Sequence, residues 1–224
     1  MKGTLIVMEG ADGSGKATQT QRLFFSLKKD GKIARVLSFP NYDSESSSLV
    51  KMYLRGDFGK TAAEVSPYAA SLFYAADRFA SFKQNWQKDY EAGEIFLADR
   101  YVASNFVHQG VKLGKDEREN FIKWLSDLEY EKLALPKPDL TLFLDMPPKI
   151  SFSLVKERGR EDIHEKDGEY LKKTYEVYRE LAKKFDWTQI PCYNGDLPRS
   201  VDDIAKDIYA TVKDFFTVRN IKSS

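Results

Sequence analysis

The chain has 224 residues, enough for one domain of ordinary enzyme size, and its 35 basic and 34 acidic side chains leave a formal net charge of +1. This balance excludes a general nucleic-acid or membrane-surface binder, so only local basic clusters can recognise phosphate. The single cysteine, Cys192, cannot form an internal disulfide, which agrees with a reducing cytoplasm. No apolar run approaches the ~20 residues of a membrane span, and the N-terminal run is too short for a signal peptide.

The first predicted element is a strand over residues 5–8, a continuous apolar run typical of a strand buried on both faces. It leads into Gly-Ala-Asp-Gly-Ser-Gly-Lys-Ala at residues 10–17, which fits the phosphate-binding pattern G-x-x-x-x-G-K-[ST] except at its last position. The loop amides can surround phosphate oxygens, and Lys16 can reach the β- and γ-phosphates of a nucleotide. Ala17 replaces the hydroxyl that usually helps to hold Mg²⁺, and Thr18 points about 100° away along a helix.

A helix follows the loop, with apolar residues on one face, and ends at Asp30-Gly31. Further strands are predicted over residues 33–39, 94–99, 140–145 and 189–193. Further helices are predicted over residues 66–90, over 101–132 with a break at Gly114, and over 200–218. Alternating strands and helices indicate an α/β fold, a parallel five-stranded sheet with helices on both faces. The most charged window, residues 156–165, joins two helical patterns.

Ligands of such sheets collect at the carboxyl ends of the strands, so we expect Asp99, Asp145 and the glycine loop at one edge. Arg100 follows Asp99 directly, and an arginine can bind phosphate through two hydrogen bonds, which a lysine cannot. Tyr74 and Arg78 lie one turn apart on one helix face, where a ring can stack on a flat base and a guanidinium can bind its edge.

Six motifs, in this order over about residues 3–210, resemble those of the thymidylate kinases, a group of P-loop nucleoside-monophosphate kinases. The motifs are G-A-D-G-S-G-K-A-T, F-P-N-Y, L-F-Y-A-A-D-R, D-R-Y-V-A-S-N, P-D-L-T-L-F-L-D and an Arg-Gly-Arg segment. The resemblance implies one P-loop NTPase-type domain, residues 1–224, with a small helical lid at about 156–167. It also implies that ATP and Mg²⁺ are used to convert dTMP into dTDP, and that the protein is a cytoplasmic homodimer. Gly13 stands where one group of the family has a loop arginine, so the resemblance implies the type, similar to many bacterial members, whose catalytic arginine lies in the lid.

The resemblance also implies the roles of individual residues. The implied ATP-binding residues are Gly10, Ala11, Asp12, Gly13, Ser14, Gly15, Lys16, Ala17 and Thr18. The implied catalytic residues are Asp12, Lys16, Arg100, Arg158 and Arg160, with Asp99 beside the metal. The implied substrate-binding residues are Phe39, Tyr42, Tyr74, Arg78, Arg100, Ser104, Asn105 and His108. Residues 194–196 fall where the family's adenine-side loop begins.

Several positions depart from the family pattern. Ala17 lacks the hydroxyl, Tyr74 replaces a phenylalanine that stacks on thymine, His108 replaces an aromatic residue near the sugar, and Ile163 stands near an expected lid arginine. Two alternatives therefore stay open: a kinase for a different nucleoside monophosphate or a deoxynucleoside, and a nucleotide-binding protein with weak catalysis. Structural roles also stay open, namely an ion pair for Asp99 and Arg100, a core position for Tyr74, and an ordinary solvated connection for the lid.

Overall fold

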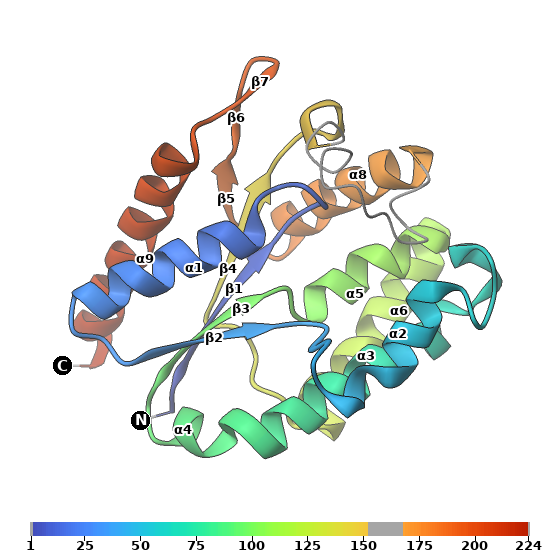
Figure 1. Ribbon diagram of the computed structural model, residues 1–224, viewed down its shortest axis with the longest axis horizontal. Coiled ribbons are helices and arrows are strands. Elements are labelled where there is room, and N and C mark those ends of the chain that lie inside the picture. The colour runs from blue at the N-terminus through green and yellow to red at the C-terminus, as the bar shows by residue number, and fades with distance from the viewer. Residues whose placement is uncertain (1, 152–167, 224) are drawn as a thin grey trace.

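The computed structural model describes residues 2–151 and 168–223, without the side chains of residues 62 and 220–223. Five strands form one parallel sheet in the order β2-β3-β1-β4-β5, crossing the centre of the molecule (Figure 1). These strands are β1 (Thr4–Glu9), β2 (Ala34–Ser38), β3 (Ile95–Asp99), β4 (Leu140–Asp145) and β5 (Thr188–Pro191). The predicted α/β fold with a five-stranded parallel sheet is confirmed.

The predicted helices are present, although several are subdivided. The helix after the glycine loop is α1 (Lys16–Lys29), and the last helix is α9 (Val201–Ser223). The helix predicted over residues 66–90 consists of α3 (Pro67–Ser81), the π-helical turn η3 (Phe82–Trp86) and α4 (Gln87–Glu91). The region 101–132 consists of α5 (Val102–His108), η4 (Gly110–Lys112), α6 (Lys115–Ser126) and the π-helical η5 (Asp127–Lys132). The helix α8 (Gly168–Lys184) precedes β5.

The elements between β2 and α3, and a hairpin near the C-terminus, were not predicted from the sequence. The missed elements are η1 (Glu45–Ser47), α2 (Ser48–Arg55), η2 (Ala62–Glu64), β6 (Tyr193–Asn194) and β7 (Leu197–Pro198). The serine-rich start of this region has the composition of a loop, yet the Ser44 hydroxyl accepts a hydrogen bond from the Ser46 amide and begins η1. The fifth strand of the sheet ends at Pro191, because the chain then turns away into the β6–β7 hairpin.

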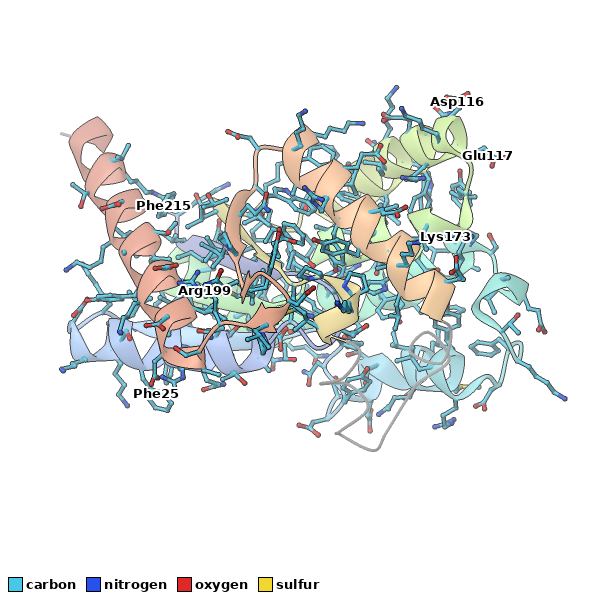
Figure 2. All side chains as sticks on the ribbon, turned by 90° about the horizontal axis from the view of Figure 1, so that it is seen from above. Phe25, Asp116, Glu117, Lys173, Arg199 and Phe215 are labelled. Carbon is cyan, nitrogen blue, oxygen red and sulfur yellow. The ribbon has the colours of Figure 1, made fainter. Side chains whose placement is uncertain are left out.

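Alternating side chains of the sheet build two separate cores. Leu5 and Val7 of β1 belong to a cluster with residues of α5, α6 and α8, whereas Ile6 and Met8 belong to a cluster with residues of α1 and α9. The helices α1 and α9 lie side by side on one face of the sheet, and α5, α6 and α8 lie on the other (Figures 1 and 2). Cys192 is buried, and burial raises the pKa of its thiol to about 12. In the described part of the chain, no helix has both the length and the apolar character needed to cross a bilayer.

The carboxyl ends of β1, β2 and β3 meet at one edge of the sheet. Met8 and Ser38 are both register partners of Asp99, the last residue of β3. The Arg100 amide donates to the Met8 carbonyl oxygen at 3.0 Å, and the Phe39 amide donates to the Asp99 carbonyl oxygen at 3.1 Å. The peptide bond between Phe39 and Pro40 is cis. This register brings the glycine loop, Asp99 and Arg100 together, as the sequence predicts.

Candidate active site

The glycine loop joins β1 to α1 in a conformation that suits close approach of phosphate. Gly10 and Gly15 have positive φ values of 152° and 87°. A Cβ atom at Gly10 would lie 2.8 Å from both the Leu144 carbonyl oxygen and Ser14 Oγ, so the loop needs glycine here. The first amides of α1 and the positive end of its dipole face the loop, an arrangement that favours a bound anion.

Lys16 is buried inside the loop. Its Nζ donates to the carbonyl oxygens of Gly10 at 2.9 Å and Ala11 at 2.8 Å. Burial and the nearby Arg100 charge lower the pKa of Lys16 to about 8. The ammonium is thus held by neutral carbonyl groups in a poorly solvated place, where phosphate oxygens would be stronger partners.

The hydroxyl groups nearest to Ala17 in the sequence are those of Ser14, Thr18 and Thr20. Ala17 and Thr18 are both exposed, and the Thr20 hydroxyl donates to the Lys16 carbonyl oxygen at 2.9 Å. Ser14 Oγ is buried and has no hydrogen-bond partner among the residues that the structure describes. A hydroxyl of the loop itself, at Ser14, is therefore available for a polar ligand.

Asp99 ends β3 beside the loop and fits a role near a metal. Its Oδ1 is buried without a hydrogen-bond partner in the described part of the chain, and its charge acts on Lys16. Within residues 2–151 and 168–223, no three histidine, cysteine or acidic side chains gather as a metal cage. Mg²⁺ commonly binds through one or two carboxylates, water and substrate phosphates, so one unsatisfied carboxylate beside a phosphate loop fits this metal.

Arg100 begins the turn between β3 and α5 with a φ of 67°, a left-handed conformation that is uncommon for residues other than glycine. Its guanidinium forms an ion pair with Asp12 of the glycine loop. Its Nη1 lies 3.4 Å from Ser104 Oγ and 3.3 Å from His108 Nε2. Burial alone would lower the pKa of Arg100, but the surrounding acidic groups, with Asp12 the strongest among them, together outweigh burial and raise the pKa. The structure thus brings four predicted site residues, Asp12, Arg100, Ser104 and His108, into direct contact.

Glu9 lies beneath this cluster and was not predicted. It is fully buried at the end of β1, on the side of the sheet that faces α5 and α8. Its Oε1 accepts the amides of Tyr101 at 3.0 Å and Ser104 at 3.1 Å, and its Oε2 accepts the hydroxyls of Ser104 at 2.7 Å and Tyr178 at 3.2 Å. Burial raises the pKa of Glu9. The carboxylate therefore caps the N-terminus of α5, whose N-cap residue supplies no side-chain cap.

The predicted base pocket contains Tyr74, which is half-buried on α3. Its ring makes an edge contact with Tyr53, with 6.3 Å between the centroids. Tyr53 is fully buried, and its hydroxyl accepts a 2.9 Å hydrogen bond from Lys112, whose pKa burial lowers to about 8. Asn105 is buried on α5, and its Nδ2 has no hydrogen-bond partner among the described residues. Phe39 is buried against Tyr101, with 5.7 Å between the ring centroids.

Arg78, predicted to bind the edge of the base, lies in a buried ion pair. Its Nε donates to Glu129 Oε2 at 2.7 Å, and its Nη2 bonds to Glu129 Oε1. The side chains of Arg78 and Glu129 are 2% and 0% exposed. A contact between Arg78 and a base stays a prediction, and it would have to use Nη1, which Glu129 does not engage.

His108 links Arg100 to the beginning of α8. The Tyr170 hydroxyl donates to the His108 carbonyl oxygen at 2.7 Å and lies 3.4 Å from its Nδ1. The two rings are stacked, with 6.4 Å between the centroids. The role of His108 near a sugar stays a prediction, but its contacts are those of a hydrogen-bonding residue between two helices.

The loop after β2 carries Tyr42, which is 53% exposed at the same edge. Asp77 of α3 holds this loop, because its carboxylate accepts the Asn41 amide at 2.8 Å and the Ser46 hydroxyl at 2.6 Å. Asp145, at the end of β4, is buried and accepts the Tyr175 hydroxyl at 2.8 Å. It is therefore part of the packing under the site.

The predicted lid residues Arg158 and Arg160 lie outside the described residues. The predicted adenine-side segment, residues 194–196, lies at the exposed β6–β7 turn, where Asp196 pairs with Lys149 at 3.0 Å. Among the functional residues that sequence reasoning missed, Glu9 offered a signal, because it is a charged residue that directly follows an apolar, buried run. Glu129 and Tyr178 offered none, since each lies in a segment that reads as an ordinary amphipathic helix.

The fold, the glycine loop with its buried lysine, and the arginine paired across the edge define a P-loop enzyme that acts on phosphorylated nucleotides. The sequence model of the family described as Thymidylate kinase matches residues 8–197. The chain belongs to the thymidylate kinase family and is a nucleotide kinase.

Relatives support this assignment along nearly the whole chain. The thymidylate kinase of Mycobacterium tuberculosis is 32% identical over 189 residues, which cover 80% of this chain and 85% of the relative. The probable thymidylate kinase of Pyrococcus horikoshii is 32% identical over 213 residues, covering 95% and 97%. The solved thymidylate kinase from Candida albicans superposes with a TM-score of 0.71 over 95% of this chain and 92% of that chain, at 23% identity, which shows a shared fold.

Proposed function

We propose that this kinase transfers the γ-phosphoryl group of ATP to the 5′-phosphate of dTMP, giving ADP and dTDP. The ion pair between Asp12 and Arg100 carries the proposal, because it joins the loop suited to the donor phosphates to an arginine suited to the acceptor phosphate. Membership of the thymidylate kinase family supports dTMP as the acceptor.

The reaction forms a bond between an oxygen of the acceptor phosphate and the γ-phosphorus, while the bond from phosphorus to the β–γ bridging oxygen breaks. Such a transfer needs in-line positioning and neutralised charge rather than covalent help from the protein. Lys16 would exchange the carbonyl oxygens of Gly10 and Ala11 for phosphate oxygens, and the negative charge of these oxygens would raise its lowered pKa again.

Arg100 would hold the acceptor phosphate from the opposite side. Its Nη1 contacts with Ser104 and His108 are 3.4 Å and 3.3 Å long, so phosphate oxygens can replace them at little cost. Asp12 would keep the guanidinium beside the donor loop while the acceptor binds. Tyr42 would contribute from the loop after β2, and Tyr74 would stack on the base.

Mg²⁺, when bound with ATP, neutralises charge on the phosphates and orients them. Asp99 is the protein group proposed to hold it, directly or through water. Arg158 and Arg160 are the proposed lid arginines that stabilise charge on the transferred group, a role that can contribute about 10³–10⁵ in rate. A cytoplasmic homodimer is proposed from the resemblance to the family.

A coupled assay of ADP release tests the function with dTMP, dUMP, dCMP and thymidine as acceptors. We expect dTMP to give the highest kcat/KM, and Lys16→Met to abolish turnover. Lys28→Met is the matched control, because Lys28 lies exposed on the same helix. A preference for another acceptor would refute the dTMP assignment, whereas ATP binding without turnover at any Mg²⁺ concentration would favour a nucleotide-binding protein.

A further inference from the structure

Glu9 is a fully buried carboxylate at the phosphate-binding edge, and the proposed mechanism gives it no role. It is the last residue of β1, and Gly10, the next residue, opens the phosphate loop. A buried carboxylate costs much desolvation energy unless several donors compensate it. Here four donors from α5, the turn before it and α8 do so.

The direction of these hydrogen bonds follows from the charge of Glu9. A carboxylate only accepts, so the hydroxyls of Ser104 and Tyr178 must both donate to it. The Ser104 hydrogen is thereby directed at Glu9, and its oxygen lone pairs remain for Arg100, whose Nη1 lies 3.4 Å away. Glu9 thus decides whether Ser104 presents a lone pair or a hydrogen to the guanidinium.

Glu9 also holds the backbone on which Arg100 stands. Arg100 has a left-handed φ of 67°, and its amide donates to the Met8 carbonyl oxygen. The next amide, of Tyr101, donates to Glu9 at 3.0 Å. The Met8 carbonyl oxygen and the Glu9 carboxylate therefore hold the main chain of this turn. The Glu9 carboxylate also holds the side chain of Ser104.

We propose that Glu9 is a positioning residue for the acceptor phosphate: it orients Ser104 and the β3–α5 turn so that Arg100 presents its guanidinium to the monophosphate. This inference rests on the proposed function in one respect, that Arg100 binds the acceptor. It adds a specific residue that acts through Arg100 without contacting the substrate.

Glu9→Gln tests the proposal, because glutamine keeps the shape and introduces an amide donor. The amides of Tyr101 and Ser104 can only donate, so the glutamine oxygen must face them and its NH₂ group must face the hydroxyls of Ser104 and Tyr178. The Ser104 hydroxyl then accepts from this NH₂ group, and its hydrogen must turn toward Arg100. We expect KM for dTMP, and its Kd by calorimetry, to rise about tenfold, which corresponds to ~1.4 kcal/mol of lost binding. We expect KM for ATP to change less than about twofold, since the loop backbone is untouched.

Ser104→Ala should raise KM for dTMP in the same direction, and the double variant should be no worse than Glu9→Gln alone, because both changes act through one hydroxyl. Asp139→Asn is the matched control: its carboxylate accepts the Leu5 amide at the opposite end of the sheet, and its loss should leave both KM values unchanged. If Glu9→Gln does not fold, the proposal is tested with Ser104→Ala alone. An unchanged KM for dTMP in that variant overturns the proposal.

Equal changes in the KM values for dTMP and ATP would also overturn it, since they would indicate a role in the scaffold only. Unchanged kinetics of Glu9→Gln would do the same. Failure of the proposed function is seen separately in the wild-type enzyme, as absence of dTMP turnover. Calorimetric Kd values for dTMP then still compare Glu9→Gln with the wild type, and an unchanged Kd overturns the inference.

Discussion

Replacing Glu129 by glutamine should destabilise the protein strongly, because it leaves the charge of Arg78 buried without a counter-charge. The two side chains are 2% and 0% exposed and share two hydrogen bonds, so almost no water can take the place of the carboxylate. Removing one partner of such a pair typically costs about 3–5 kcal/mol. In a protein of this size 1 kcal/mol lowers Tm by about 2–4 °C, so we expect a fall in Tm of roughly 6–20 °C.

The assay is urea and thermal unfolding followed by circular dichroism, with a matched control two residues further along η5. Glu131→Gln removes a carboxylate from an exposed pair with Lys137, whose side chains are 59% and 65% exposed, and should cost at most ~1 kcal/mol. The double replacement of Arg78 by Met and Glu129 by Leu should recover most of the lost stability, because no buried charge remains. A loss below ~1 kcal/mol for Glu129→Gln, or a double variant as unstable as the single one, would refute the reasoning.

Three further predictions concern the site. Ala17→Thr should lower the Mg²⁺ concentration for half-maximal activity, measured by titrating Mg²⁺ at saturating nucleotides; an unchanged value would mean that Asp99 and water hold the metal without a loop hydroxyl. Arg100→Lys should lower kcat/KM for dTMP by about 10²-fold or more, because lysine lacks the planar guanidinium that binds phosphate through two hydrogen bonds. A kcat/KM of the variant close to that of the wild type, measured by steady-state kinetics, would contradict this. Lys112 has a pKa lowered by burial from 10.5 to about 8, so the unfolded chain holds this proton more tightly between these values. The stability of the wild type relative to Lys112→Met should therefore rise as pH increases from about 8 to 10.5, by at most ~1.4 kcal/mol per pH unit; a difference in Tm that is constant between pH 7.5 and 9.5 would argue against a buried ammonium.

The elements that touch the phosphates could be predicted from the sequence because their signals are local. An apolar run, a glycine loop and an amphipathic helix follow one another within residues 4–29, and the parallel topology then puts Asp99 and Arg100 at the same edge. Asp12 and Arg100 form an ion pair because both lie at this edge of the sheet. No pattern in the sequence predicts that these two residues contact each other.

The remaining site contacts depend on packing between distant segments. Tyr178 reaches Glu9 across 169 positions of sequence, and only the placement of α8 against the sheet makes that contact. Glu129 stands in a charged stretch that reads as a solvated helix face, with Glu131 exposed as expected. The π-helical geometry of η5 changes the residues per turn, and Glu129 faces the interior. Periodicity of 3.6 residues could not predict this.

The burial of Cys192 has a practical consequence for observing the enzyme at work. With a thiol pKa of about 12, only on the order of one molecule in 10⁵ carries a thiolate at pH 7, and that sulfur has no exposed surface. Thiol-reactive dyes and spin labels should therefore not react with Cys192 in the folded protein. A cysteine introduced at any exposed position can be labelled without first removing the natural one, so distances across the phosphate-binding edge become measurable in an otherwise unaltered protein.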